Sequence, residues 1–291
     1  MPSWQSYLVH PVLRFQVKRR LARAATPQAA RSAFNNALPP PKGARFQPDI
    51  MGGIGGEWVD SDHTGAGTIL YLHGGGYFAC SAKTHRPITA AYALRGFKVF
   101  APDYRLAPEH PFPAAVDDAL ACYRAMLDIV PASGLVISGD SAGGGLALAT
   151  LLAAKAAHLP MPACAVLFSP WTDLAGTGES VTTNARRDSM LYAPRLREAG
   201  ANYLSGADPK TPLASPLYGD LTGLPALLIQ VGAPEILLDD STRLAAAARA
   251  AGVPVDISIW QNLPHVWQMM PTLLPEARRA LDEAASFINR A

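Results

Sequence analysis

A serine flanked by glycines stands where an apolar stretch meets a predicted helix. Gly139, Ser141 and Gly143 directly follow the apolar run from Leu135 to Ser138. A buried strand that turns sharply into a helix lifts a serine hydroxyl above the sheet, and only glycine tolerates the tight backbone on both sides. The helix N-terminus would also aim the amide of Ala142 at a developing negative charge. We therefore interpret Ser141 as a nucleophile.

Three glycines in a row follow the predicted strand from Thr68 to Leu72, in the sequence His73-Gly74-Gly75-Gly76. The backbone amides of such a run are not screened by side chains, which suits an oxyanion hole. We expect the amides of Gly74 and Gly75 to act there together with that of Ala142. A phosphate-binding loop is the alternative, but neither GK[ST] nor GxGxxG follows.

A serine nucleophile needs a general base, usually a histidine. This histidine should come after the last strand, because enzymes with this serine turn carry their catalytic residues in the order serine, acid, histidine. Of the seven histidines, only His265 lies there, just past the predicted strand from Val255 to Trp260. We therefore predict that His265 takes the proton of Ser141.

The acid that orients this histidine should follow the preceding strand, Ala226 to Val231. Glu235 stands nearest to the end of that strand, and Asp239 and Asp240 come next. Because the two aspartates directly precede Ser241 and a predicted helix, N-capping is their other natural role. We favour Glu235 as the acid and keep the aspartates as alternatives.

Short apolar runs alternate with longer Ala/Leu-rich helices along the chain, the pattern of a mostly parallel sheet in an α/β protein. The predicted strands cover Thr68 to Leu72, Lys98 to Ala101, Leu135 to Ser138, Ala165 to Phe168, Ala226 to Val231 and Val255 to Trp260. The predicted helices lie near Ala114 to Ile129, Gly143 to Ala157, Pro194 to Leu204, Ser241 to Ala251 and Glu276 to Asn289. The stretch from Pro170 to Leu224 interrupts this alternation, and so long an excursion is often a lid.

The bulk composition fits one large α/β domain, since 49% of the 291 residues are hydrophobic and 16% are charged. No apolar run reaches the roughly 18 residues that span a bilayer, so we expect no stable membrane insertion. Three cysteines without CxxC spacing indicate reduced thiols. Together with an N-terminus unlike a secretory signal, they predict a cytoplasmic protein.

The N-terminal segment is strongly basic, with eight Lys and Arg residues and no acidic residue before Asp49. Such a segment can bind nucleic acid or an anionic membrane. However, Trp4, Leu8, Val12 and Phe15 recur at helical spacing, and we expect this apolar stripe to be buried. We therefore favour a helix docked on an acidic body and predict no nucleic-acid partner.

Three motifs together resemble the hormone-sensitive-lipase-like esterases, the bacterial family IV carboxylesterases. They are His73 to Gly76, the segment Asp103-Tyr104-Arg105-Leu106-Ala107-Pro108-Glu109, and Gly139 to Gly144. The likeness extends from about Gly53 to the C-terminus. It implies an α/β-hydrolase core with a mostly parallel eight-stranded sheet flanked by helices, under a small helical cap.

The resemblance implies cap helices in residues 1–45 and a catalytic domain in residues 46–291 with a cap insertion near 171–216. It implies hydrolysis of short- to medium-chain acyl esters by Ser141 without a cofactor. The histidines show no HExxH or similar ligand spacing, so we expect no metal. The binding partner would be a small ester substrate. Whether the protein also forms a homodimer is left open by the sequence. Arg105 and Glu109, charged residues among apolar ones, should form a salt bridge.

The chain departs from the family pattern at two positions. Glu235 stands where the family commonly has Asp, and Cys80 stands where it often has Gly. The rival interpretations are a peptidase or amidase with the same three residues, and a non-catalytic binding protein. The sequence shows no signature for recognition of a peptide terminus, which a peptidase would need. A non-catalytic binding protein would be expected to have lost Ser141 or His265.

Overall fold

The computed structural model describes residues 2–24, 26–34, 38–63 and 65–291. Its centre is one sheet with the strand order β1-β2-β4-β3-β5-β6-β7-β8. The strands are β1 Arg45–Met51, β2 Ile54–Asp60, β3 Thr68–Leu72, β4 Lys98–Pro102, β5 Leu135–Asp140, β6 Cys164–Phe168, β7 Ala226–Gly232 and β8 Val255–Trp260. β2 pairs antiparallel with β1 and β4, and the other neighbours are parallel. The mostly parallel eight-stranded sheet is thereby confirmed.

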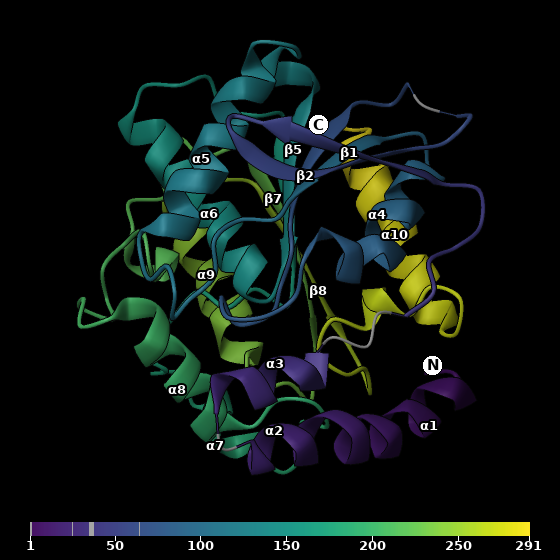
Figure 1. Cartoon of the computed structure of the whole chain (residues 1–291), viewed down its shortest axis with the longest axis vertical. Helices are drawn as coiled ribbons and strands as arrows, with labels where there is room; N and C mark the ends of the chain where they lie inside the picture. Colours follow the sequence, from purple (N-terminus) through teal and green to yellow (C-terminus); the bar gives the residue numbers. More distant parts are fainter. Residues whose placement is uncertain (1, 25, 35–37, 64) are drawn as a thin grey trace.

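Helices cover both faces of the sheet, which explains why β3, β5 and β6 are buried along their whole length. The covering helices are α4 Arg86–Ala93, α5 Ala114–Leu127, α6 Ala142–Ala156, α9 Leu238–Ala250 and α10 Pro275–Ile288. Figure 1 shows α5, α6 and α9 on one side of the sheet and α4 and α10 on the other. Short 3₁₀ turns occupy Ala82–His85, Ala132–Gly134, Pro216–Tyr218 and Trp267–Met269.

Two further groups of helices lie together at one end of the molecule (Figure 1). The N-terminal group comprises α1 Trp4–Leu13, a π-helical turn Arg14–Lys18, α2 Arg19–Arg23 and α3 Pro27–Phe34. The second group, α7 Ser180–Thr183 and α8 Ala193–Leu204, belongs to the excursion between β6 and β7. The Lys18 ammonium joins the two groups by donating to the carbonyls of Ala185 at 2.7 Å and Asp188 at 2.6 Å. In the described part of the chain, no helix is long and apolar enough to cross a membrane.

The predicted burial of the N-terminal stripe is wrong. Trp4, Leu8, Val12 and Phe15 are between 50% and 69% exposed, and the helix turns Val9 inward instead. Apolar residues recur at helical spacing on both sides of this helix, so periodicity alone cannot identify the buried side.

Candidate active site

The turn between β5 and α6 holds Ser141 in a backbone conformation that is rare for a side-chain-bearing residue, with φ 52° and ψ −122°. The flanking glycines make the turn feasible. A Cβ at Gly139 would lie 2.3 Å from the Gly143 carbonyl oxygen, and one at Gly143 would lie 2.0 Å from the Leu72 carbonyl oxygen. The sharp strand–turn–helix geometry predicted from the sequence is therefore present.

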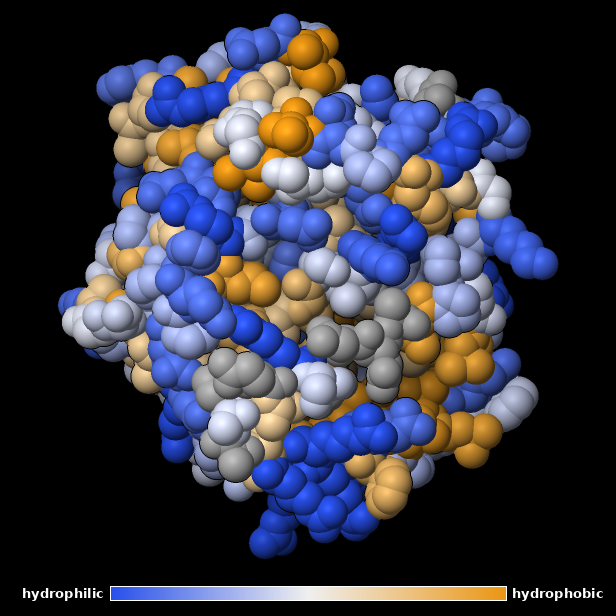
Figure 2. Space-filling view, viewed as in Figure 1, coloured by the Kyte–Doolittle hydropathy of each residue, from blue (hydrophilic) through white to orange (hydrophobic). Residues whose placement is uncertain are grey.

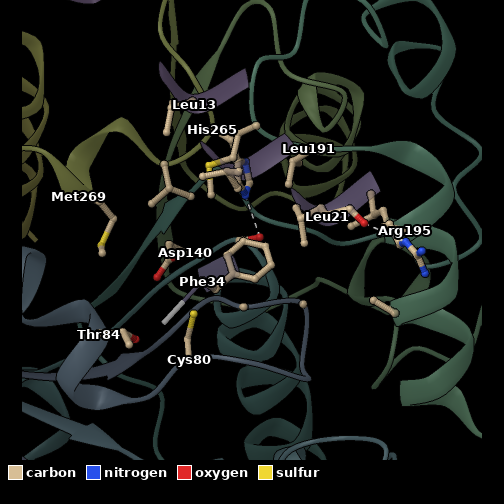
Figure 3. A pocket seen from close by; sticks show the side chains of 18 of the residues that line it. Leu13, Leu21, Phe34, Cys80, Thr84, Asp140, Leu191, Arg195, His265 and Met269 are labelled. Atoms are coloured by element: carbon tan, nitrogen blue, oxygen red, sulfur yellow. Dashed lines mark hydrogen bonds between the residues drawn. The ribbon is translucent and has the colours of Figure 1, made fainter. Parts of the chain in front are cut away.

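Ser141, His265 and Glu235 form a continuous chain of hydrogen bonds. His265 Nε2 lies 2.9 Å from Ser141 Oγ, and His265 Nδ1 lies 2.6 Å from Glu235 Oε2 (Figure 3 shows the first of these bonds). In the neutral imidazole, Nδ1–H donates to the carboxylate, so Nε2 is free to accept the serine proton. All three side chains are buried, and the loops after β5, β7 and β8 supply them.

The carboxylate of Glu235 is held from its other side as well. Oε1 accepts hydrogen bonds from Ser169 Oγ at 2.7 Å and from the Gly232 amide at 2.5 Å. These contacts fix Oε2 toward His265, so the longer arm of a glutamate reaches the histidine in a defined orientation. The sequence analysis missed Ser169, although it follows β6 at the edge of the sheet where the other site residues lie.

The charge of Glu235 decides the proton affinity of His265. Burial alone would lower the pKa of His265, but the Glu235 carboxylate, its hydrogen bond and the more distant charges of Asp188 and Asp140 outweigh it. The pKa is consequently raised from its ordinary value of 6.5. The raised pKa makes His265 a stronger base toward the serine proton than an ordinary histidine.

Asp239 and Asp240 are neither partners of His265 nor N-caps, which corrects the role considered for them. They lie inside the first turn of α9, which begins at Leu238. Asp240 Oδ2 accepts from the amides of Thr172 at 2.8 Å and Asp173 at 2.9 Å. Asp239 Oδ2 accepts from the Ser180 amide at 2.8 Å, so both carboxylates tether the excursion between β6 and β7 to the core.

The structure also changes the expectation for Gly74. Its amide donates to Asp140 Oδ1 at 3.0 Å, whereas Gly75 and Gly76 line the cavity beside Ser141. Asp140 Oδ1 accepts from the Tyr71 hydroxyl at 2.6 Å as well. Asp140, the residue before Ser141, thus anchors the glycine loop, a contact that the sequence analysis did not foresee.

The cavity above Ser141 has a volume of about 230 Å³. Its walls are mainly apolar and come from the N-terminal helices, from the β6–β7 excursion and from the loop after His265 (Figure 3). The apolar lining residues include Leu13, Val17, Leu21, Phe34, Met190, Leu191, Leu196, Met269 and Met270. Within the described residues, no three His, Cys, Asp or Glu side chains gather into a group that could hold a metal ion.

Cys80 lies in the wall of this cavity with φ 74°. This left-handed conformation favours glycine, which gives a physical reason for the residue that the family often has there. Burial raises the pKa of the Cys80 thiol to about 12, so the thiol stays protonated and unreactive at neutral pH.

Arg105 and Glu109 both form salt bridges, but not with each other. The exposed Arg105 pairs with the buried Asp118, with 2.6 Å between Nη2 and Oδ1. Glu109 pairs with Arg31 of α3, whose guanidinium also donates to the Ala107 carbonyl at 2.9 Å. The segment from Asp103 to Glu109 therefore connects the N-terminal helices to the core.

The sheet, the serine turn and the order of the three residues define the class of protein. The model of the α/β-hydrolase fold family matches residues 69–269. An acetyl-hydrolase of Streptomyces hygroscopicus is 46% identical over 266 residues, which cover 90% of this chain and 87% of that protein. An esterase of Acinetobacter venetianus is 34% identical and covers 98% of this chain and 96% of its own length.

A crystal structure of an esterase from the bacterial hormone-sensitive lipase family superimposes with a TM-score of 0.94 at 39% identity, covering 100% of this chain and 99% of that one. The chain belongs to the hormone-sensitive-lipase-like esterases of the α/β-hydrolase fold, and it is a carboxylic ester hydrolase.

Proposed function

We propose that this esterase hydrolyses short- to medium-chain acyl esters through an acyl-enzyme on Ser141. The observation that carries the proposal is the buried hydrogen-bonded chain from Ser141 through His265 to Glu235, with distances of 2.9 Å and 2.6 Å. A serine hydroxyl within reach of an oriented imidazole is the arrangement that covalent catalysis of acyl transfer requires.

In the proposed mechanism, His265 removes the Ser141 proton as the serine oxygen attacks the ester carbonyl. We propose that the amides of Gly75, Gly76 and Ala142 donate hydrogen bonds to the oxyanion, since the Gly74 amide already donates to Asp140. His265 then protonates the departing alcohol, and water releases the acyl group by the same steps. Glu235 keeps Nδ1 protonated and stabilises the imidazolium.

We further propose that residues 1–45 and an insertion near 171–216 act together as a cap over the core. Both segments contribute side chains to the catalytic cavity, among them Leu13 and Leu191. They are also joined directly, since Arg195 Nε donates to the Leu21 carbonyl at 3.0 Å. In this division, the cap forms the acyl-binding wall, and residues 46–291 outside the insertion carry the chemistry.

Nitrophenyl esters from acetate to palmitate test the substrate class. A cavity of about 230 Å³ lies below the roughly 300–1,000 Å³ of typical ligand pockets. We expect kcat/KM to be highest among the short and medium chains and to fall steeply toward palmitate. A profile that rises continuously to palmitate would contradict the proposal, and Ser141→Ala measures the background hydrolysis of each ester.

The pH profile of kcat/KM tests the role of His265. Only the neutral imidazole can accept the serine proton, so activity should be lost as pH falls through the pKa of His265. Because that pKa is raised above its ordinary value of 6.5, the acid limb should lie above pH 6.5. An acid limb well below that value in a buffer series of constant ionic strength would exclude the charge arrangement described here.

A further inference from the structure

The N-terminal helix has an outer apolar face that the esterase reaction does not use. Trp4, Tyr7, Leu8, Val12 and Phe15, here called the outer stripe, are between 50% and 69% exposed. Their spacing places them on one side of the helix. Large contiguous apolar patches are rare on soluble proteins and mark sites where another surface docks.

Basic side chains surround the outer stripe. Arg14 lies within its span, and Arg19, Arg20 and Arg23 follow it along the chain. All four arginines are exposed. The Arg19 guanidinium lies 5.4 Å from the ring centre of Phe15, so charge and apolar surface are in direct contact. Figure 2 shows strongly hydrophilic and hydrophobic side chains next to each other along the lower edge, where Figure 1 places these helices.

A groove beside the outer stripe is lined by a further arginine, which comes from another part of the chain. Its walls include Arg14 and Arg19 from the N-terminal helices, Arg187 from the β6–β7 excursion, and the rings of Tyr7 and Phe15. None of the described residues that line this groove is acidic. The fold therefore concentrates positive charge beside apolar side chains.

The same helix faces the active site with its opposite side. Leu13, Val17 and Leu21 line the cavity that holds Ser141 and His265. A helix with its side chains is about 10 Å thick. Whatever binds the outer stripe therefore lies one helix diameter from the catalytic cavity.

We propose that the outer stripe and its arginines dock the enzyme on an anionic lipid surface, with the helix lying in the plane of the interface. An apolar helix face beside basic residues is the arrangement that binds the boundary between headgroups and acyl chains. Nucleic acid would satisfy the arginines but leave the apolar side chains in water. A second copy of the chain would bring the same patch against itself, and the arginines would repel one another.

Vesicle flotation of the full chain tests the docking. We expect binding to vesicles of equal parts phosphatidylglycerol and phosphatidylcholine, no comparable binding to phosphatidylcholine alone, and loss of binding at high ionic strength. The pair Arg19→Gln/Arg20→Gln should lower the partition coefficient about 30-fold. The pair Trp4→Ser/Phe15→Ser should lower it at least about tenfold, because it removes buried apolar area.

Matched substitutions elsewhere on the surface serve as controls. Ile50 and Ile129 are 68% and 60% exposed outside the outer stripe, so Ile50→Ser/Ile129→Ser should bind like the unmodified enzyme. The same holds for Arg124→Gln/Arg249→Gln. Ser141→Ala should also bind fully, which separates docking from the proposed catalytic mechanism. Thermal unfolding of every variant shows whether a loss of binding reflects a loss of structure.

Four results would overturn the docking proposal. The first is absence of binding to the anionic vesicles, and the second is equal binding with and without phosphatidylglycerol. The third is a dimer, detected by light scattering, that Trp4→Ser/Phe15→Ser dissociates, because it would assign the outer stripe to a second copy of the chain. Binding by the stripe variants at the level of the control variants would contradict it equally.

Discussion

Ser141→Ala should lower kcat for ester hydrolysis by about 10⁶-fold while leaving the fold intact. Removal of the nucleophile of a serine–histidine–acid triad has an effect of this order, because the remaining groups have no covalent step to assist. The lost hydroxyl makes its hydrogen bond to His265 at 2.9 Å, and alanine fits the space that it leaves. Initial rates on a nitrophenyl ester of short chain length give the measurement.

The matched control is Ser133→Ala, which changes an exposed serine in the turn before β5 and should keep full activity. A small phosphonate inhibitor should label the unmodified enzyme once and Ser141→Ala not at all, as seen in the intact mass. Residual activity above about one per cent in a preparation free of other esterases would show that another group carries the reaction.

The serine turn could be predicted because its determinants are local in the sequence. Gly139 and Gly143 are required by the close approach of backbone to backbone, and this requirement does not depend on distant packing. His265 and Glu235 could be predicted for a different reason. The carboxyl ends of parallel strands share one edge of a sheet, so the order of the strands brings the loops that carry these residues near the serine.

The features that the sequence analysis missed depend on the direction in which side chains point. Gly74 and Asp140 lie 66 positions apart, and no spacing rule indicates that the carboxylate would accept the glycine amide. Asp239 and Asp240 stand just before Ser241, the predicted start of the helix, where N-caps lie. However, the helix begins three residues earlier, at Leu238. Their carboxylates are therefore available to tether a distant segment.

The N-terminal helix illustrates a second limit of sequence patterns. Val9 and Leu13 lie on one side and Trp4 and Leu8 on the other, so both sides have apolar residues at helical spacing. The choice between them depends on contacts with residues far away in the sequence. Ser3, for example, donates its hydroxyl to Glu276 Oε2 at 2.9 Å and fixes how the helix lies on the core.

Glu235→Gln should lower kcat by roughly 10⁴-fold, the effect of replacing a triad carboxylate by an amide. The amide NH₂ can donate to Nδ1 of His265, which stabilises the tautomer whose Nε2 carries a proton and cannot accept one from Ser141. The substitution also removes the main influence that raises the pKa of His265, while burial continues to lower it. The acid limb of the remaining activity should therefore move to lower pH.

This shift distinguishes an electrostatic role of Glu235 from a purely structural one. A variant that merely loosened the loop after β7 would lose activity without moving the acid limb, because the charge facing His265 would be unchanged. Asp239→Asn and Asp240→Asn provide that comparison, since their carboxylates bind backbone amides of the excursion and not the histidine. They should mainly lower the unfolding temperature and keep the acid limb in place. If either aspartate variant lost the activity that Glu235→Gln kept, the acid would have to be reassigned.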